Sequence, residues 1–302
     1  MPRLSGAVVN HLLTGDELSD TELASLHERA AELKAGRGRG EGAGALAGRS
    51  VALLFGRPST RTRVSFEVAV TELGAAAVTL RGDELQLGRG ESIADTARVL
   101  SRYLHAIVVR WQEHDPVAEL AAASEVPVVN ALTPLHHPCQ ALAELLTLRE
   151  RLGGLDGVSL AYVGDGNNVA RSLTILGGKA GVEVRVATPK GYELEPGLAA
   201  LDTHDPREAA TGADALYTDV WVSMGDEPDA DHRRADLAPY QLNEELLSLA
   251  SGRAILLHCL PAHPGEEITE DVLYGERSAA WDQAENRLHA QKALLEHLLS
   301  GA

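Results

Sequence analysis

The sequence contains little cysteine and no long apolar run. Two cysteines, Cys139 and Cys259, occur in 302 residues. That is too few for a disulfide framework, and it fits a protein that works in a reducing compartment. No apolar run reaches the length of a transmembrane helix, and the N-terminal residues lack the basic-then-apolar pattern of a secretory signal. We therefore expect a soluble protein of the cytoplasm.

Positive charge is scarce as well. The chain has 27 lysines and arginines against 44 acidic residues, so its net charge is −17. A charge of this sign argues against nucleic acid or an anionic membrane as the main partner. An acidic protein that binds an anion must gather positive charge locally. A cluster of arginines is therefore informative in this background.

Length and patterning predict an α/β protein of two domains. The hydrophobic content is 44%, and 302 residues exceed one typical domain. Short apolar runs alternate with helical patterns in both halves, which predicts parallel sheets flanked by helices. The predicted strands are 51–55, 76–80, 105–111, 126–130, 158–163, 182–188, 213–218, 254–260 and 279–281.

The domain boundary is expected near a long amphipathic helix at 138–152. The pattern predicts two α/β domains that join near residues 135–150, and a last helix at 285–299. Two further expectations concern local structure. A helix at 16–35 has Asp20 or Thr21 as its cap. Residues 225–239 are acidic and lack apolar periodicity, so they are predicted to form a mobile loop.

An arginine-rich turn follows the first predicted strand. Hydroxyl and guanidinium side chains alternate there, just before an apolar helical face begins: Arg57, Ser59, Thr60, Arg61, Thr62 and Arg63. Free N–H groups and the positive end of the helix dipole lie at such a helix start, so the turn suits a phosphate or another dianion. The alternative is an ordinary helix cap with solvated arginines.

Other candidate residues stand at strand ends and helix starts. Arg110 closes a buried strand, where it could polarise a carbonyl oxygen or form a salt bridge to Glu113 or Asp115. His137 and Gln140 open the long helix and provide neutral donors. Zinc would be conceivable with nearby cysteine and histidine, but the ligand spacings do not match known zinc patterns, so no metal is expected.

The second half offers weaker candidates. The turn at 164–172 begins like a dinucleotide fingerprint, but Val169 replaces its third glycine. Asn167 and Asn168 at a helix start would suit an amino-acid carboxylate equally well. Asp219 ends a predicted strand and could bind an ammonium group. The remaining candidates, each unconvincing alone, are Gln86 in a glycine-flanked turn, Ser223, Cys259 and Arg287.

Taken together, these segments resemble the aspartate and ornithine carbamoyltransferase family. The resemblance runs from about residue 51 to the last helix. It is carried by the motifs Ser59-Thr60-Arg61-Thr62-Arg63, His137-Pro138-Cys139-Gln140, Asp219-Val220-Trp221-Val222-Ser223-Met224-Gly225, His258-Cys259-Leu260-Pro261 and Asp282-Gln283-Ala284-Glu285-Asn286-Arg287. The third and fourth motifs are those of the ornithine branch. The aspartate branch has a lysine in the loop around Gln86, and this chain has none there. Pro264 departs from the family pattern.

The resemblance implies a carbamoyl-phosphate domain of residues 1–136 to which the C-terminal helix 285–302 returns, and an ornithine domain of residues 137–284. It also implies no cofactor, and a homotrimer or a multiple of trimers. It implies transfer of a carbamoyl group from carbamoyl phosphate to L-ornithine, giving citrulline and phosphate. Arg61, Arg110, His137, Asp219 and Cys259 are then the catalytic residues. The implied carbamoyl-phosphate ligands are Ser59, Thr60, Arg61, Thr62, Gln86 from a neighbouring subunit, Arg110, His137, Gln140, Cys259, Leu260 and Arg287. The implied ornithine ligands are Asn168, Asp219, Ser223 and Met224.

Three alternatives stay open at this point. A carbamoyltransferase for another amine, such as putrescine or a modified ornithine, would share the phosphate motif. An NAD-dependent oxidoreductase would need the missing third glycine of the fingerprint. A binding protein without activity would be expected to lack one of the arginines or the histidine of the motifs, and all are present.

Overall fold

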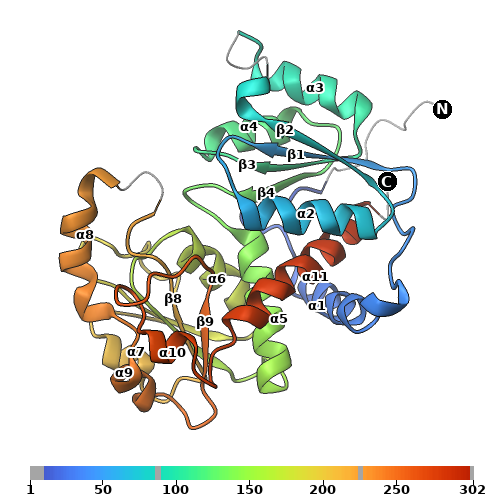
Figure 1. Ribbon diagram of the computed structural model, residues 1–302. Helices are drawn as coiled ribbons and strands as arrows, with labels where there is room; N and C mark the ends of the chain where they lie inside the picture. Colours follow the sequence, from blue (N-terminus) through green and yellow to red (C-terminus); the bar gives the residue numbers. More distant parts are fainter. Residues whose placement is uncertain (1–9, 86–89, 224–226, 300–302) are drawn as a thin grey trace.

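A computed structural model describes residues 10–85, 90–223 and 227–299. It contains two parallel β-sheets, each flanked by helices, with long helices between them (Figure 1). This confirms the predicted fold class. No helix in the described residues is long and apolar enough to cross a membrane.

The first sheet has the strand order β2-β1-β3-β4, and all its pairs are parallel. Along β1, Val51 and Leu53 pack with the core under helix α2, whereas Ala52 and Leu54 pack with α3 and α4 on the opposite face. The alternation of a strand thus buries both faces of the sheet. The elements are β1 (Ser50–Phe55), α2 (Thr60–Glu72), β2 (Ala76–Arg81), α3 (Ile93–Tyr103), β3 (Ala106–Arg110), α4 (Asp115–Ala123) and β4 (Val128–Leu132).

The second sheet has the order β7-β6-β5-β8-β9 and is also parallel throughout. The order reverses at β5, and the loops that leave β5 and β8 therefore diverge to opposite sides, which opens a crevice at their carboxyl ends. The elements are β5 (Ser159–Val163), α6 (Asn168–Lys179), β6 (Glu183–Ala187), β7 (Leu201–Thr203), α7 (Pro206–Ala210), β8 (Ala215–Thr218), α8 (Ala230–Leu237), α9 (Glu244–Leu249), β9 (Ile255–His258) and α10 (Glu270–Leu273).

Three long helices connect the two sheets: α1 (Asp20–Ala35), α5 (Pro138–Leu152) and α11 (Ala280–Leu299). Helix α11 packs against α1, α2 and α5, so the last helix of the chain returns to the first domain. Polar contacts tie it there: Asn286 Nδ2 donates to Thr147 Oγ1 of α5 at 3.0 Å, and Lys292 Nζ, itself buried, pairs with Glu72 of α2 at 3.0 Å.

The structure corrects four local predictions. Residues 279–281 form no strand, because a single bridge between Leu256 and Ser278 is followed at once by α11. Residues 225–239 include helix α8, which buries Leu237. The cap of α1 is Ser19, which forms a reciprocal capping box with Glu22. The short strand β7 was not predicted, since it has only three residues.

Candidate active site

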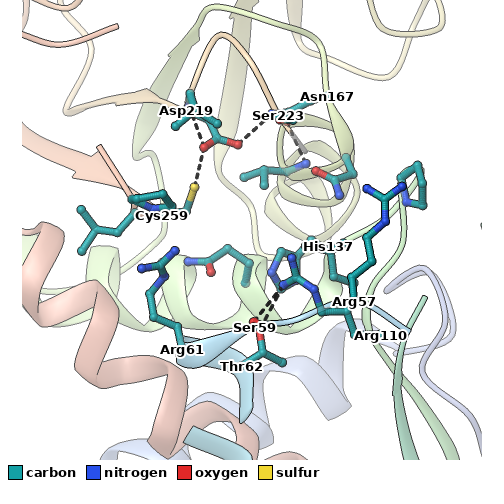
Figure 2. A pocket seen from close by; sticks show the side chains of 18 of the residues that line it. Arg57, Ser59, Arg61, Thr62, Arg110, His137, Asn167, Asp219, Ser223 and Cys259 are labelled. Carbon is teal, nitrogen blue, oxygen red and sulfur yellow. Dashed lines mark hydrogen bonds between the residues drawn. The ribbon is translucent and has the colours of Figure 1, made fainter. Parts of the chain in front are cut away.

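A cavity of about 690 Å³ lies between the two sheets, at the carboxyl ends of their strands (Figure 2). Both domains line it. From the first domain come the β1–α2 turn and the end of β3, and from the second come the turns after β5, β8 and β9. Helices α5 and α11 add His137, Gln140 and Arg287. Parallel sheets commonly bind ligands at this edge.

The start of α2 faces the cavity without a side-chain cap. The N-cap residue Ser59 makes no capping hydrogen bond to the first turn; its hydroxyl instead accepts from Arg110 Nη1 at 3.2 Å. Thr62 Oγ1 accepts from Arg110 at 3.4 Å and from Arg287 Nη2 at 3.2 Å. The helix therefore presents N–H groups and the positive end of its dipole to the cavity, as an anion site requires.

Arginines surround this helix start, although fewer than the sequence suggests. Arg57 and Arg61 line the cavity together with Arg110 and Arg287. Arg63 is exposed and pairs with Glu67 at 3.0 Å, and it is not among the lining residues. Two of the three arginines of the turn therefore line the cavity, and the third does not.

Arg110 makes no salt bridge to Glu113 or Asp115, which removes that alternative. Within the described part of the chain, no carboxylate lies at ion-pair distance from Arg110 or Arg287. Burial, together with the nearby charges of Arg287, Arg61 and Arg57, lowers the pKa of Arg110 to about 10. The pKa of Arg287 is lowered chiefly by burial. A bound anion would relieve the mutual repulsion of these buried cations.

Several buried donors around these arginines have no hydrogen-bond partner among the described residues. They are Arg110 Nε, Gln140 Nε2 and Arg287 Nε, and one ring nitrogen of His137, Nδ1, is likewise unpartnered. Burial and the charges of Arg287 and Arg110 lower the pKa of His137 well below its ordinary value, so its ring is neutral. Buried polar atoms are normally satisfied, so this cluster is suited to a polar ligand. We call Ser59, Arg61, Thr62, Arg110, His137, Gln140 and Arg287 the cationic wall.

The opposite side of the cavity is built around Asp219, at the end of β8. Its Oδ1 accepts from the Cys259 thiol at 2.8 Å, and its Oδ2 accepts from Asn167 Nδ2 at 2.8 Å (Figure 2). Burial and the neighbouring Asp219 carboxylate raise the pKa of Cys259 well above its ordinary value, so the thiol stays protonated. We call Asn167, Asn168, Asp219, Ser223 and Cys259 the acidic wall.

The remaining predicted residues are placed as follows. Thr60, Asn168, Ser223 and Leu260 line the cavity. Asn168 Nδ2 donates to the backbone carbonyl of Thr133 at 2.6 Å. The backbone N–H of Leu260 donates to His258 Nδ1 at 2.9 Å, so this N–H is already used within the protein. Gln86 and Met224 lie outside the described residues.

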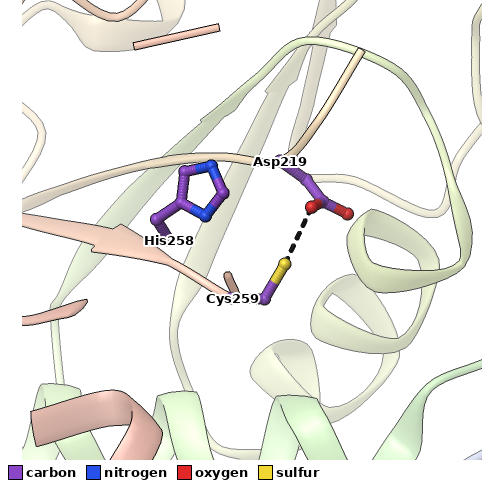
Figure 3. A group of neighbouring side chains, drawn as sticks. All are labelled: Asp219, His258 and Cys259. Atoms are coloured by element: carbon purple, nitrogen blue, oxygen red, sulfur yellow. Dashed lines mark hydrogen bonds between the residues drawn. The ribbon is translucent and has the colours of Figure 1, made fainter. Parts of the chain in front are cut away.

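Asp219, His258 and Cys259 are close enough together to be considered as metal ligands (Figure 3). Both ring nitrogens of His258 are engaged, however: Nε2 lies 3.0 Å from Glu267 Oε1, and Nδ1 accepts from the backbone N–H of Leu260. The Cys259 thiol is protonated and donates to Asp219. The donor set is therefore occupied by contacts within the protein and does not fit a metal ion.

Arg233 is a lining residue that was not predicted from the sequence. Arg233 of α8 forms a partly buried ion pair with Asp165 in the turn after β5, and its Nε donates to the backbone carbonyl of Trp221 at 2.8 Å. This contact could not be predicted from the sequence, because Asp165 lies 68 positions from Arg233 and residues 225–239 are acidic overall. Asn167, expected beside Asn168 at this helix start, also lines the cavity, and its amide donates to Asp219.

Fold and site together define a class: a two-domain α/β protein whose interdomain cavity joins an anion-binding helix start to a carboxylate that can hold an amine. Comparison with known proteins specifies the class further. The carbamoyl-P binding domain of aspartate/ornithine carbamoyltransferases matches residues 10–150, and their Asp/Orn binding domain matches residues 156–298. The chain belongs to the aspartate/ornithine carbamoyltransferase family.

Individual relatives cover nearly the whole chain. An ornithine carbamoyltransferase of Acidothermus cellulolyticus is 55% identical over 98% of this chain and 98% of its own length. One of Archaeoglobus fulgidus is 48% identical over 96% of this chain and 98% of its own length. Among solved structures, the ornithine carbamoyltransferase from Pyrococcus furiosus superposes with a TM-score of 0.93 at 46% identity, covering 99% of this chain and 100% of that one.

Proposed function

We propose that this protein is an ornithine carbamoyltransferase, which transfers the carbamoyl group of carbamoyl phosphate to the δ-amine of L-ornithine and releases L-citrulline and phosphate. One observation carries the proposal: a cationic wall and an acidic wall face each other across one cavity. A dianionic donor and a cationic acceptor are the pair of substrates that such a cavity suits. The similarity to named ornithine carbamoyltransferases over nearly the full chain supports it.

In this proposal carbamoyl phosphate binds the cationic wall. The first-turn N–H groups of α2, the hydroxyls of Ser59, Thr60 and Thr62 and the Arg61 guanidinium hold the phosphate. The unpartnered donors supplied by Arg110, His137, Gln140 and Arg287 surround the carbamoyl group. The backbone at Cys259–Leu260 completes the pocket; since the Leu260 N–H is engaged with His258, the carbonyl groups there are the groups that remain to accept from the carbamoyl nitrogen.

Ornithine binds the acidic wall. The Asp219 carboxylate binds the α-ammonium group. Asn168, Ser223 and the backbone at Met224 bind the α-carboxylate and the remaining N–H groups of the α-ammonium. The chain of ornithine then extends toward the cationic wall, which brings its δ-amine to the carbonyl carbon of carbamoyl phosphate. The protonated Cys259 beside Asp219 adds no negative charge near the attacking amine, which favours the neutral, nucleophilic form of that amine.

The reaction needs no covalent intermediate on the protein. The δ-nitrogen attacks the carbonyl carbon and forms a C–N bond. The bond between that carbon and the oxygen that bridges it to phosphorus breaks. Phosphate leaves with the bonding electron pair, and the proton lost by the amine passes to the leaving phosphate. Arg110 and the neutral His137 donate to the carbonyl oxygen as it gains negative charge. Preorganised donors of this kind are worth roughly 3–4 kcal/mol each by mutagenesis in other enzymes.

The domain assignment follows the same division. We propose that residues 1–136 with the C-terminal helix 285–302 bind carbamoyl phosphate, and that residues 137–284 bind ornithine. We also propose a homotrimer, or a multiple of trimers, in which Gln86 reaches the active site of a neighbouring subunit, and a cytoplasmic location. Both cysteines are free thiols, and Cys259 donates a hydrogen bond to Asp219, which supports a reducing compartment.

The test is a citrulline assay with carbamoyl phosphate that compares L-ornithine, putrescine, N-acetylornithine and aspartate as acceptors. Turnover restricted to ornithine is the expected result. Turnover with putrescine or a modified ornithine would retain the phosphate site and make the assignment of the acidic wall wrong. Absence of turnover with every acceptor would overturn the proposed activity.

A further inference from the structure

Glu144 is a buried carboxyl for which the proposed reaction has no use. It lies on α5, one turn after Gln140, and is fully buried. Its Oε1 accepts from the hydroxyl of Tyr217 in a short contact and from Gln283 Nε2 at 3.1 Å. Its Oε2 has no hydrogen-bond partner among the described residues, and no cation there pairs with it. A buried acid in this setting requires an explanation.

The surroundings favour the uncharged acid. An ionised carboxylate without a cationic partner is costly to bury, and such groups usually remain protonated. Burial raises the pKa of Glu144 to about 8, even though the hydrogen bonds from Tyr217 and Gln283 stabilise the anion. The charge of Asp219 opposes ionisation further. At neutral pH the group is therefore a neutral carboxylic acid.

Glu144 contacts the elements that carry the reacting groups. Tyr217 precedes Asp219 by two residues on β8, and Gln283 precedes Arg287 by one turn of α11. Gln283 also accepts, through its Oε1, from the backbone N–H of His258 at 2.9 Å, which fixes the end of β9 just before Cys259. One carboxyl thus connects α5 with β8 and α11, and through Gln283 with the end of β9.

We propose that Glu144 is a positioning residue that acts as an uncharged acid, holding the cationic wall and the acidic wall in register through Tyr217 and Gln283. The inference rests on the proposed function for its kinetic consequences, but not for its effect on stability. Glu144 touches neither substrate: it acts through Tyr217 on Asp219 and through Gln283 on Cys259 and Arg287.

Ionisation of Glu144 would disturb this arrangement. The titratable groups whose charges act on it, or on which its charge acts, are Tyr162, Tyr217, Asp219, Cys259 and Arg287. Arg287 is the cation among them. A negative Glu144 would attract Arg287 away from Gln140, to which its Nη1 donates at 2.9 Å, and would repel Asp219. The positioning is therefore expected to weaken as pH rises through about 8.

The first test is the stability of Glu144→Gln relative to the unaltered protein, without substrates. The native pKa of about 8 lies above the unfolded value, so the folded state holds the proton longer. Glu144 therefore costs stability progressively as pH rises from about 4.5 to 8, by up to about tenfold in the unfolding equilibrium constant per pH unit, and the cost is constant above that. The glutamine variant lacks this cost. Its advantage in Tm should widen between pH 5 and 8 and then level off.

A constant difference in Tm between pH 5 and 9 would mean that Glu144 ionises as an exposed glutamate does, and would overturn the proposal. Because this measurement uses no substrate, it stands even when the assignment of the reaction fails. The matched control is Thr147→Val, which removes a similarly buried α5–α11 contact, to Asn286, that has no connection to β8 or β9. Its difference in Tm should not depend on pH.

The second test is kinetic. The ratio of kcat/KM for Glu144→Gln to that of the unaltered protein should be flat below pH 7 and should rise above pH 8. The titration of every group that both proteins contain cancels in this ratio. Glu144→Leu, which removes the acceptor shared by Tyr217 and Gln283, should lose more than about tenfold in kcat/KM at pH 7. If it fails to fold, Tyr217→Phe removes one of these donors, together with the 3.3 Å hydrogen bond that its hydroxyl accepts from Gln283, and should raise the KM for ornithine several-fold. A ratio independent of pH, or an unchanged KM in Tyr217→Phe, would overturn the positioning role.

Discussion

The cationic and acidic walls of the cavity satisfy their polar groups in different ways. Arg110, Gln140 and Arg287 each keep a buried nitrogen without a hydrogen-bond partner among the described residues. Asp219, by contrast, accepts hydrogen bonds at both of its oxygens, from Cys259 and Asn167. The cationic wall is preorganised for a ligand, whereas the acidic wall must exchange internal hydrogen bonds for those of its ligand. This difference predicts that an anion binds the cationic wall with less rearrangement than an amine causes in the acidic wall.

The largest expected effect comes from Arg110→Met. This variant removes a donor to the carbonyl oxygen and part of the charge that neutralises the phosphate, so kcat/KM for carbamoyl phosphate should fall on the order of 10³-fold. Steady-state kinetics with ornithine in excess measure it. The control is Arg63→Met, because Arg63 lies in the same helix but outside the cavity, paired with Glu67. An equal loss in both variants would show that general charge, not the wall, is responsible.

On the acidic wall, Asp219→Asn should raise the KM for ornithine about 100-fold, because the α-ammonium group loses its charged partner. The KM for carbamoyl phosphate should change less than about threefold, since the cationic wall does not depend on Asp219. Asp214→Asn is the matched control: Asp214 precedes the other end of β8 and pairs with Arg253 at 2.9 Å. It should lower stability without changing either KM. A comparable rise in both KM values of Asp219→Asn would contradict the independence of the walls.

Cys259→Ser should have a smaller effect. The replacement keeps a donor but shortens its reach to Asp219, so the KM for ornithine should rise about fivefold, as expected for a weakened hydrogen bond. The pH dependence of kcat/KM for ornithine should shift with it. Cys139→Ser serves as the control, since the Cys139 thiol donates to the carbonyl of Asn130 beneath α5. An unchanged KM and an unchanged pH profile would remove Cys259 from the mechanism.

The smallest change is expected for anion affinity across pH. Sulfate keeps its charge over this range and should compete with carbamoyl phosphate. Arg110, with a pKa of about 10, stays charged up to pH 9. His137 stays neutral down to pH 6.5, because its pKa lies well below 6.5. The inhibition constant of sulfate should therefore vary less than about twofold between pH 6.5 and 9. A steep decline in affinity below pH 9 would mean that the cationic wall loses charge.

Sequence analysis predicted the cationic wall better than the acidic wall. Ser59, Arg61 and Thr62 are adjacent in the chain, and helix-start physics assigns them to an anion without knowledge of tertiary structure. Arg110 was left undecided, since strand position alone did not distinguish a ligand contact from a salt bridge. Only the structure shows that its guanidinium turns to Ser59 and Thr62.

Long-range contacts explain most of what the sequence did not predict. Glu144 meets Tyr217 across 73 positions of sequence and Gln283 across 139, and no local pattern encodes such pairs. Arg233 meets Asp165 across 68 positions. The two parallel sheets, in contrast, follow from local periodicity, and most strand positions were predicted within two residues. The false strand at 279–281 arose because an apolar helix start resembles a short buried strand.

Helix α11 gives the cavity an order of assembly during synthesis. Arg287 follows in sequence every other described residue that lines the cavity, and it reaches them only when α11 packs against α2 and α5. A nascent chain that has already folded its two sheets therefore still lacks the guanidinium that bridges Gln140 and Thr62. Because domains fold as they leave the ribosome, N-terminal first, the part of the anion pocket that one chain supplies is complete only after α11 has been synthesised and has packed.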